Sequence, residues 1–254
     1  RLLHINSKEY IEFILKILVT NKFVYSSLNG YEKLMLNMLY YELWQDTLEK
    51  AGFNSIEDCI FKLKECHQLL NEIISILKYN LENIDFKEKE MKLDYPCPLK
   101  LHSRYSMAEI LAAFEEHKLD YKSSFREGVK YLEKKKTDVF FITLNKSEKD
   151  YSETTMYDDY AIDDEYFHWQ SQSGTSDTSP TGQRYINHES LGSKVILFVR
   201  ERKSVNGITE PYYCLGTAKF VRYEGSKPMS IVWKLDNKMP EFIKKKASGN
   251  VMVG

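Results

Sequence analysis

The sequence lacks the short motifs by which many enzymes are identified. It contains no Walker A loop, no His-Glu-x-x-His zinc signature and no His-x-Lys motif of the phospholipase-D nucleases, since Lys118 directly follows His117. Its four cysteines form no Cys-x-x-Cys pair, and the spacing of Cys59 and Cys66-His67 fits no common zinc signature. We therefore expect reduced, packed thiols, no metal and no cofactor.

Long hydrophobic runs and an excess of one charge are also missing. No apolar run is long enough to span a membrane, which predicts a cytoplasmic protein without a membrane partner. The chain begins with Arg1 rather than methionine, so we expect it to be a fragment of a longer protein. Its 36 basic residues nearly balance its 37 acidic residues, so net charge identifies no partner. Apolar residues make up 43% of the chain, enough for a substantial core.

Residues 1–92 have the pattern of a helical bundle. The stretch "SKEYIEFILKILV" offers Ser7 as an N-cap before apolar residues at helical spacing. A second periodic segment, "YEKLMLNMLYYELW", follows, and Ser55 with Asp58 resembles a capping box before a third. We expect these helices to serve as scaffold or linker.

Residues 93–254 are expected to form a second domain. The proline pair in "DYPCPLKLHSRYS" interrupts the helical period, and Ser106 with Glu109 resembles a capping box on a short helix. Strand patterns follow in "VKYLE", "DVFFITLN", "KVILFVRER", "YYCLGTAKFVRY" and "PMSIVWKL", with a turn at Asn206-Gly207. Residues 173–182, rich in glycine, serine and threonine, predict a loop. The sequence thus predicts an α+β protein whose strands form a small curved sheet or barrel with flanking helices.

Charge is distributed unevenly along the second domain. Residues 150–183 carry eight acidic residues and no lysine or arginine, and the acids are interleaved with tyrosine, phenylalanine and tryptophan. Residues 184–234 carry nine basic residues and four acidic ones, which suits phosphate contacts as well as a mixed solvated surface. An acidic, aromatic stretch is unfavourable beside DNA unless it forms a pocket for an extruded base. Such a pocket stacks the base on aromatic rings and accepts the cytosine N4 hydrogen with an oxygen.

Long stretches of the second domain resemble a known family. "LNKSEKDYSETTMYDDYAI", "FHWQSQS", "SPTGQRYINH" and "YYCLGTAKFVRYEGSKPMSIVWKL" are similar to the C-terminal domain of SauUSI-type restriction enzymes, type IV enzymes that cut DNA with modified cytosine. The resemblance covers about residues 105–247. It implies a non-catalytic, SRA-like reader of the PUA-like group that flips 5-methylcytosine or 5-hydroxymethylcytosine out of duplex DNA. It also implies upstream helicase and nuclease domains in the same polypeptide.

Within this hypothesis, candidate residues fall into two groups. The base pocket is drawn from the acidic, aromatic segment: Tyr157, Asp159, Tyr160, His168, Trp169, Gln170 and Gln172. The remaining DNA contacts are drawn from the following loop and the basic strands: Ser171, Ser173, Thr181, Gln183, Arg184, Tyr185, Asn187, Arg200, Arg202, Lys219 and Lys227. Along a strand through "YFHWQSQS", His168, Gln170 and Gln172 share one face and Phe167, Trp169 and Ser171 the other. If one face is core, we expect it to be that of Phe167.

Two alternatives remain open. The chain is also compatible with a regulatory module that docks on a helicase–nuclease and contacts DNA nonspecifically. A third reading assigns metal-dependent nuclease activity to Glu133 or Glu201, each in a Glu-x-Lys triplet of the kind found in some nucleases. Such triplets are common by chance in a chain with 29% charged residues, so we expect no cleavage by this chain alone.

Overall fold

The computed structural model describes residues 2–126, 128–145 and 159–248, and it has the mixed α+β composition that the sequence predicts. The chain divides into two compact units, residues 1–124 and residues 125–254. The sequence predicted a boundary after residue 92. Residues 93–124, which include helix α6, are instead part of the first unit, because α6 packs against helix α2 of that unit.

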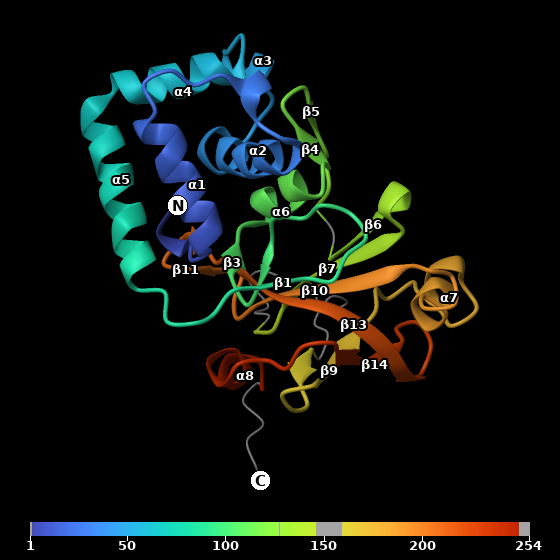
Figure 1. Ribbon diagram of the computed structural model, residues 1–254. Coiled ribbons are helices and arrows are strands. Elements are labelled where there is room, and N and C mark those ends of the chain that lie inside the picture. The colour runs from blue at the N-terminus through green and yellow to red at the C-terminus, as the bar shows by residue number, and fades with distance from the viewer. Residues whose placement is uncertain (1, 127, 146–158, 249–254) are drawn as a thin grey trace. The chain divides into compact units, whose positions relative to one another are not determined.

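The first unit is mainly helical (Figure 1). Its helices are α1 (Lys8–Val19), α2 (Gly30–Trp44), α3 (Leu48–Ala51), α4 (Ile56–Glu65), α5 (His67–Glu82) and α6 (Met107–Ala113), with 3-10 turns η1 (Leu2–His4) and η2 (Tyr25–Ser27). Short strands follow the long helices: β1 (Lys89–Glu90), β2 (Lys100–Leu101), β3 (Arg104–Tyr105), β4 (His117–Lys118) and β5 (Tyr121–Lys122). The helices bury apolar stripes against one another, as the sequence periodicity predicts.

The helix starts agree with the capping patterns in the sequence. Ser55 accepts a hydrogen bond from the Asp58 amide, and Ser106 forms a full capping box with Glu109. Ser7 occupies the N-cap position of α1 but makes no capping hydrogen bond. Asn29 forms a further capping box with Glu32, which fixes the start of α2 at Gly30.

The second unit is built around a large mixed sheet. Its strands are β6 (Val129–Leu132), β7 (Thr137–Thr143), β8 (Tyr160–Ala161), β9 (Tyr166–Gln170), β10 (Lys194–Arg200), β13 (Tyr212–Glu224) and β14 (Ser230–Leu235), hydrogen-bonded in the order β6-β7-β10-β13-β14-β9-β8. Strands β7 and β10 run parallel, whereas the other neighbours on this path are antiparallel. A separate hairpin joins β11 (Ser204–Val205) and β12 (Ile208–Thr209) through the predicted Asn206-Gly207 turn, where both residues have positive φ.

The core of the second unit lies between one face of this sheet and two short helices. Figure 1 shows α7 (Pro180–Ile186) and α8 (Glu241–Ala247) at opposite ends of the sheet. Both contribute to the core cluster, α7 through Tyr185 and α8 through Ile243. The 3-10 turn η3 (Glu133–Lys135) links β6 to β7 in the predicted hairpin. The predicted buried strand from Val195 to Val199 is confirmed as part of β10.

The prediction of a barrel is not confirmed, because the described strands form an open sheet. Strands β6 and β8 lie at the two ends of the hydrogen-bonded path and do not pair with each other in the part of the chain that the structure describes. Closure requires the end strands to pair along their length, but β8 has two residues and β6 has four. Side chains of α7 and α8 cover the inner face of the sheet instead.

No helix among the described residues is long and apolar enough to cross a membrane.

Stability should decrease in mild acid, because the first unit buries an uncharged histidine. Burial, and then the nearby Lys89, lower the pKa of His102 to about 4, and its Nε2 atom has no hydrogen-bond partner among the described residues. In the unfolded chain the pKa is about 6.5, so below that pH the unfolded chain binds a proton that the folded chain does not. We expect the free energy of unfolding to fall by about 2 kcal/mol between pH 7.5 and 5 from this residue.

Urea unfolding at the two pH values measures this effect. His102→Asn should reduce the pH dependence, since asparagine tolerates the left-handed backbone at this position (φ 67°). It should not abolish it, because burial also lowers the pKa values of His117 and His188. His67→Gln, at an exposed position of α5, is the control, and an equal pH dependence in both variants would contradict the assignment.

Candidate nucleic-acid interface

Strand β9 separates the residues of "YFHWQSQS" as its alternation predicts. Phe167 and Trp169 are buried in the core, whereas Tyr166, His168 and Gln170 are partly exposed on the opposite face. The expectation that the face of Phe167 is the core face is confirmed. The two faces of β9 therefore have different roles, and a base on the outer face cannot contact Trp169 without rearrangement of the strand.

Trp169 belongs to an aromatic cluster on the inner face. Its ring lies 4.3 Å from the ring of Phe140 and 5.5 Å from that of Tyr185, measured between centroids. Only 5% of its surface is exposed. The structure thus places this predicted pocket residue in the core, for the ordinary reason that burying a large ring releases the most apolar surface.

The outer face contains a pair of stacked rings. Tyr160 on β8 lies directly opposite His168 on β9, and their ring centroids are 4.7 Å apart with an interplanar angle of 18°. On the other side of His168, strand β14 places Val232 opposite it, so the histidine lies between a tyrosine and an apolar side chain. We call six residues on this face of the three strands the β9 outer face: Tyr160, Tyr166, His168, Gln170, Ser230 and Val232, of which Val232 is only 6% exposed.

Hydrogen bonds fix the polar end of the β9 outer face. The backbone N–H of Gln170 donates to Asp159 Oδ1 at 2.9 Å, and the side-chain Nε2 of Gln170 donates to Ser230 Oγ at 3.3 Å. Asp159 is only 7% exposed, so its carboxylate acts here on the backbone of β9. Of the predicted pocket residues, Asp159, Tyr160, His168 and Gln170 are brought together. Tyr157 lies outside the described residues.

Two loops join at the same end of β9. The Ser171 amide donates to the Met229 carbonyl, and the Met229 amide donates to Ser171 Oγ. The Lys227 amide donates to the Thr175 carbonyl, and Ser226 Oγ donates to Asp177. Residues 171–179 and 225–229 thus form one rim beside Gln170 and Ser230.

The buried side of this rim accounts for further predicted residues. Gln172 Oε1 accepts hydrogen bonds from Thr175 Oγ1 at 3.2 Å and from the Tyr185 hydroxyl at 3.5 Å, so it supports the loop. Ser171 and Tyr185 are fully buried, whereas both were predicted to contact DNA. In this conformation they do not reach the surface.

Two of the predicted phosphate-binding arginines are engaged inside the protein. Arg184 donates two hydrogen bonds of 2.8 Å to the fully buried carboxylate of Asp138, and its guanidinium lies 3.9 Å from the centroid of the Tyr131 ring. Arg200 is 8% exposed and donates to Thr143 Oγ1. Both positions follow from the preference of buried carboxyl and hydroxyl groups for hydrogen-bond partners, and we leave both arginines out of the candidate interface.

The segment predicted as a loop with DNA contacts runs into helix α7. Ser179 caps this helix by accepting from the Gly182 amide, and Pro180 occupies its first turn. Gly182 is required here, because a Cβ atom would lie 1.9 Å from the Ser176 carbonyl oxygen. Ser173 is exposed, Thr181 is partly buried, and Gln183 hydrogen-bonds Asn187 along the exposed side of the helix.

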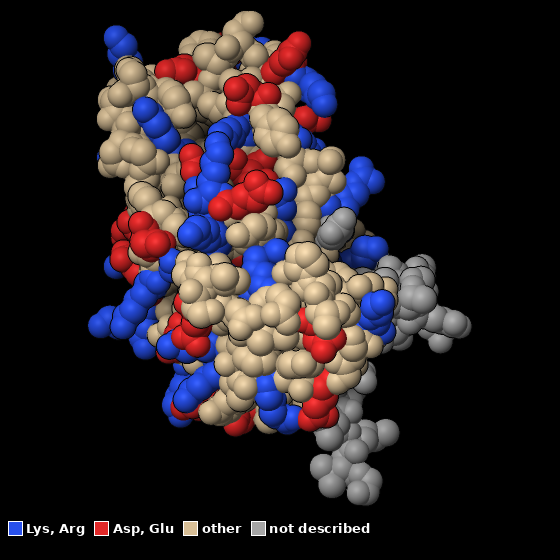
Figure 2. Space-filling model, turned by 90° about the vertical axis from the view of Figure 1, so that its right-hand side faces the viewer, with Lys and Arg blue, Asp and Glu red and all other residues tan. Residues whose placement is uncertain are grey.

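The remaining predicted basic residues are exposed. They are Arg202, Lys219 and Lys227. The Lys219 amine forms an ion pair with Glu189 at 3.1 Å, which raises the pKa of the lysine. Figure 2 shows basic and acidic side chains interspersed over the face that it presents, rather than a broad basic field. On the face shown, phosphate contacts would therefore rest on individual basic residues.

Sequence reasoning missed several residues that lie beside His168. Ser230 and Val232 pair with β9, and Arg222 on β13 pairs with Val232. The alternation of "PMSIVWKL" would have identified Ser230, Val232 and Lys234 as one face of a strand. The alternation does not show that these residues lie next to β9, because it does not determine which strands pair.

Comparison with known proteins places the end of the first unit and most of the second unit in a family. A family model described as "Domain of unknown function (DUF3427)" matches residues 99–246, more than half of the chain. None of the curated proteins is similar enough to match the chain. The family description names no activity, so the function has to be argued from the residues themselves.

Proposed function

The chain belongs to the DUF3427 family, and we propose that it recognises modified cytosine in duplex DNA without catalysing a reaction. In this proposal it is the target-recognition domain of a SauUSI-type restriction enzyme, with an SRA-like second unit and with helicase and nuclease domains elsewhere in the polypeptide. The resemblance of residues 105–247 to such domains supports the proposal. The observation that carries it is the stacked pair of Tyr160 and His168 beside Gln170 on an accessible strand face.

The β9 outer face combines the groups that an extruded cytosine needs. Flat rings give it a stacking partner, and base–aromatic stacking contributes about 1–3 kcal/mol. The Gln170 side chain offers a carbonyl that can accept the N4 hydrogen and an amide that can donate to the base edge. Val232 pairs with His168 but is only 6% exposed, so the base contacts rest on the rings and the glutamine rather than on this valine. We therefore assign the base contacts to Tyr160, His168 and Gln170.

Discrimination by the methyl group alone should be modest. Burying one carbon contributes about 0.8 kcal/mol, which is about a fourfold difference in affinity. Extrusion of the base adds a cost of a few kcal/mol that stacking and phosphate contacts must offset. Arg202, Lys219 and Lys227 are the exposed predicted cations for those contacts, and their contribution should weaken as salt is raised.

A binding titration tests the proposal directly. We expect the chain to bind a duplex with 5-methylcytosine or 5-hydroxymethylcytosine at least about fourfold more tightly than the matched unmodified duplex, at a stated salt concentration. Tyr160→Ala should weaken binding to the modified duplex by at least about fivefold, because it removes a stacking ring. Gln170→Leu should also weaken binding to the modified duplex, because it removes the hydrogen bonds to the base edge. Fluorescence anisotropy with labelled duplexes measures both effects.

Tyr79→Ala provides the matched control, since it removes an exposed tyrosine from α5 of the first unit. It should leave the titration unchanged. Equal affinity of the unsubstituted chain for modified and unmodified duplexes would contradict a reader function. Cleavage of either duplex on addition of Mg²⁺ would contradict the non-catalytic assignment.

One observation favours the docking module as a second candidate. The first unit exposes large apolar side chains on its outer helices, namely Phe61 on α4 with 62% of its surface exposed and Tyr79 on α5 with 63%. Such residues are suited to a contact with a neighbouring domain of a longer polypeptide. Equal binding of modified and unmodified DNA in the titration above is the result that this candidate predicts.

A further inference from the structure

A β-bulge in β13 turns an arginine onto the same face of the sheet as the β9 outer face. The register of β13 against β14 shifts between Phe220 and Arg222, so that Phe220 lies opposite Trp233 and Arg222 lies opposite Val232. Phe220 packs against the core, and uninterrupted alternation from it would direct Arg222 to the core face as well. The extra residue, Val221, reverses this, and Arg222 shares the face of Val232. Bulges commonly re-aim a side chain next to a functional site.

A buried histidine fixes the backbone at this bulge. His188, which follows α7, is 3% exposed. Its Nε2 atom accepts the backbone N–H of Phe220 at 3.1 Å, and its Nδ1 atom lies 3.2 Å from the Ser193 carbonyl oxygen. A neutral ring with its proton on Nδ1 satisfies both contacts. His188 therefore holds the residue that immediately precedes the extra residue of the bulge.

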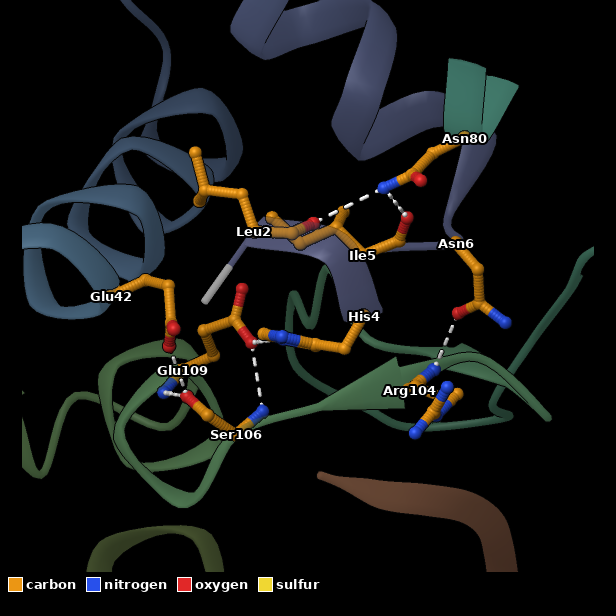
Figure 3. A network of polar contacts seen from close by, with 9 residues as sticks. All are labelled: Leu2, His4, Ile5, Asn6, Glu42, Asn80, Arg104, Ser106 and Glu109. Carbon is orange, nitrogen blue, oxygen red and sulfur yellow. Dashed lines mark hydrogen bonds and ion pairs between the residues drawn. The ribbon is translucent and has the colours of Figure 1, made fainter. Parts of the chain in front are cut away.

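The first unit uses a histidine for a different purpose. His4 Nε2 lies 2.7 Å from Glu109 Oε2, which also accepts the backbone N–H of Ser106 at 2.8 Å (Figure 3). Asn80 Nδ2 donates to two backbone carbonyls on either side of His4 in the sequence. These contacts join the N-terminal segment to α5 and α6 within the first unit. His4 is therefore a suitable comparison for His188, because its hydrogen bond lies outside the second unit.

Arg222 lies in a row of side chains that crosses four strands. In order from β13 through β14 and β9 to β8, the row consists of Arg222, Val232, His168 and Tyr160. Neighbouring strands are about 4.8 Å apart, so the backbone of Arg222 lies about 10 Å from that of His168. Arg222 is exposed, and its ion-pair partner among the described residues is the exposed Glu224. An exposed pair of this kind contributes little to stability, so a phosphate can replace the glutamate.

Two lysines extend the basic surface in the next outward row. Lys219 on β13 lies opposite Lys234 on β14. Lys234 in turn lies opposite Tyr166 on β9, with its amine 5.6 Å from the centroid of that ring. Like charges directly opposite each other on neighbouring strands are unfavourable. Glu189 pairs with Lys219 at 3.1 Å and Glu165 with Lys234 at 3.9 Å, but both lysines are exposed, so an anion that lies along β13 and β14 can reach both of them.

Resting on the proposed function, we propose that Arg222, Lys219 and Lys234 hold the phosphates beside the extruded cytosine. The backbone of that DNA strand follows β13 and β14, and the base turns toward Tyr160 and His168. Phosphate contacts set the register of a protein on DNA, whereas contacts with the base edge carry the specificity. The planar arginine fork suits a phosphate, because it can donate two parallel hydrogen bonds. The cations on β13 and β14 thereby determine which base reaches the rings on β8 and β9.

Only one of these three cations was predicted from the sequence to contact DNA. Lys219 was among the candidates, whereas Arg222 and Lys234 were not. A bulge leaves no mark in the alternation of a strand, so the face of Arg222 follows only from its register with β14.

Salt-dependent titration of the whole chain tests the phosphate contacts. Arg222→Gln and Lys234→Gln should each weaken binding to modified and unmodified duplexes alike, by at least about threefold, because phosphates carry no sequence information. Each substitution should also lower the slope of log affinity against log salt by about 0.9, the value for one phosphate. The preference for the modified duplex should stay unchanged. Arg126→Gln, at an exposed position before β6, is the matched control and should alter neither quantity.

A double-mutant cycle tests the role of His188 as a positioning residue. His188→Phe keeps a ring but cannot accept the Phe220 N–H, so Arg222→Gln should change the salt slope much less in this background. His188→Gln retains a side-chain oxygen that can accept a hydrogen bond, and it should restore part of the effect of Arg222→Gln. His4→Phe removes a histidine contact from the first unit and should leave that effect intact. Circular dichroism identifies the variants that fold, and the test of Arg222 and Lys234 does not depend on them.

The outcomes separate this inference from the proposed function. An unchanged salt slope in both Arg222→Gln and Lys234→Gln, with the preference for modified DNA retained, would overturn the inference and leave the proposed function intact. Reduced slopes without any preference for modified DNA would support the phosphate contacts and contradict the reader function. Absence of DNA binding by the unsubstituted chain would contradict both. An effect of Arg222→Gln that is as large in His188→Phe as in the unsubstituted chain would show that His188 does not position the arginine.

Discussion

Replacement of Trp169 by alanine is expected to lower the free energy of unfolding by about 3–5 kcal/mol. Trp169 is 5% exposed and packs against Phe140 and Tyr185, so truncation leaves a large cavity in the core of the second unit. The surrounding rings belong to β7 and α7 and can relax only in part. Urea unfolding monitored by circular dichroism measures the loss.

The adjacent residue provides the matched comparison. His168→Ala removes a ring from the opposite face of the same strand and should cost about 1 kcal/mol or less, the usual contribution of an exposed stacked pair. Trp169→Ala should therefore lower the free energy of unfolding more than His168→Ala does. His168→Ala should in turn lower the affinity for DNA more than its small effect on stability would suggest. A Trp169→Ala protein as stable as the unsubstituted chain would show that the residue is not part of the core.

Replacement of Arg184 by methionine should be similarly destabilising, by about 3–5 kcal/mol at pH 7. The substitution leaves the Asp138 carboxylate buried without its two hydrogen bonds from the guanidinium. Burial already raises the pKa of Asp138 even though Arg184 opposes the shift, so loss of the arginine raises it further. The deficit relative to the unsubstituted chain should therefore shrink as pH falls and Asp138 becomes protonated. Denaturant unfolding at pH 7 and pH 5 measures this dependence.

Two further variants distinguish the effect of breaking the buried ion pair from the effect of removing a positive charge. Arg202→Met removes an exposed arginine and should change stability by less than about 0.5 kcal/mol. The double variant Asp138→Asn with Arg184→Met removes the buried carboxylate along with its partner, and it should be more stable than Arg184→Met alone. Equal stability of the two single variants would mean that the buried ion pair contributes nothing measurable.

Local sequence patterns predicted the elements of this protein better than their arrangement. Capping residues such as Ser55 and Ser106 act within one helical turn, so their effect is readable from four residues. The alternation in β9 likewise gave the correct core face, because side chains of a strand alternate whatever it pairs with. Whether the sheet closes into a barrel was not predicted correctly, since closure depends on which edge strands meet, and this is set by long-range packing.

The candidate site was predicted in part for the same reason. Residue types identified Tyr160, His168 and Gln170, and strand pairing brings them together. Residue types also suggested Arg184 and Trp169, which the structure places elsewhere. An arginine that binds phosphate and an arginine that binds a buried carboxylate cannot be told apart by residue type, and the same is true of a tryptophan in a pocket and one in the core. Only the position of Asp138, 46 residues away on another strand, distinguishes the two roles for Arg184.

The pairing of β9 has a consequence for how the second unit is assembled during synthesis. Strand β9 ends at Gln170, but its inner neighbour β14 begins only at Ser230, so translation supplies the partner some 60 residues later. Strand β7 is likewise synthesised before its parallel partner β10. Contacts between such distant segments form slowly, since a long loop must close before any of them is made. A nascent chain that has not yet reached Ser230 therefore lacks the strand that pairs with β9, and the core around Phe167 and Trp169 is incomplete until β14 is made.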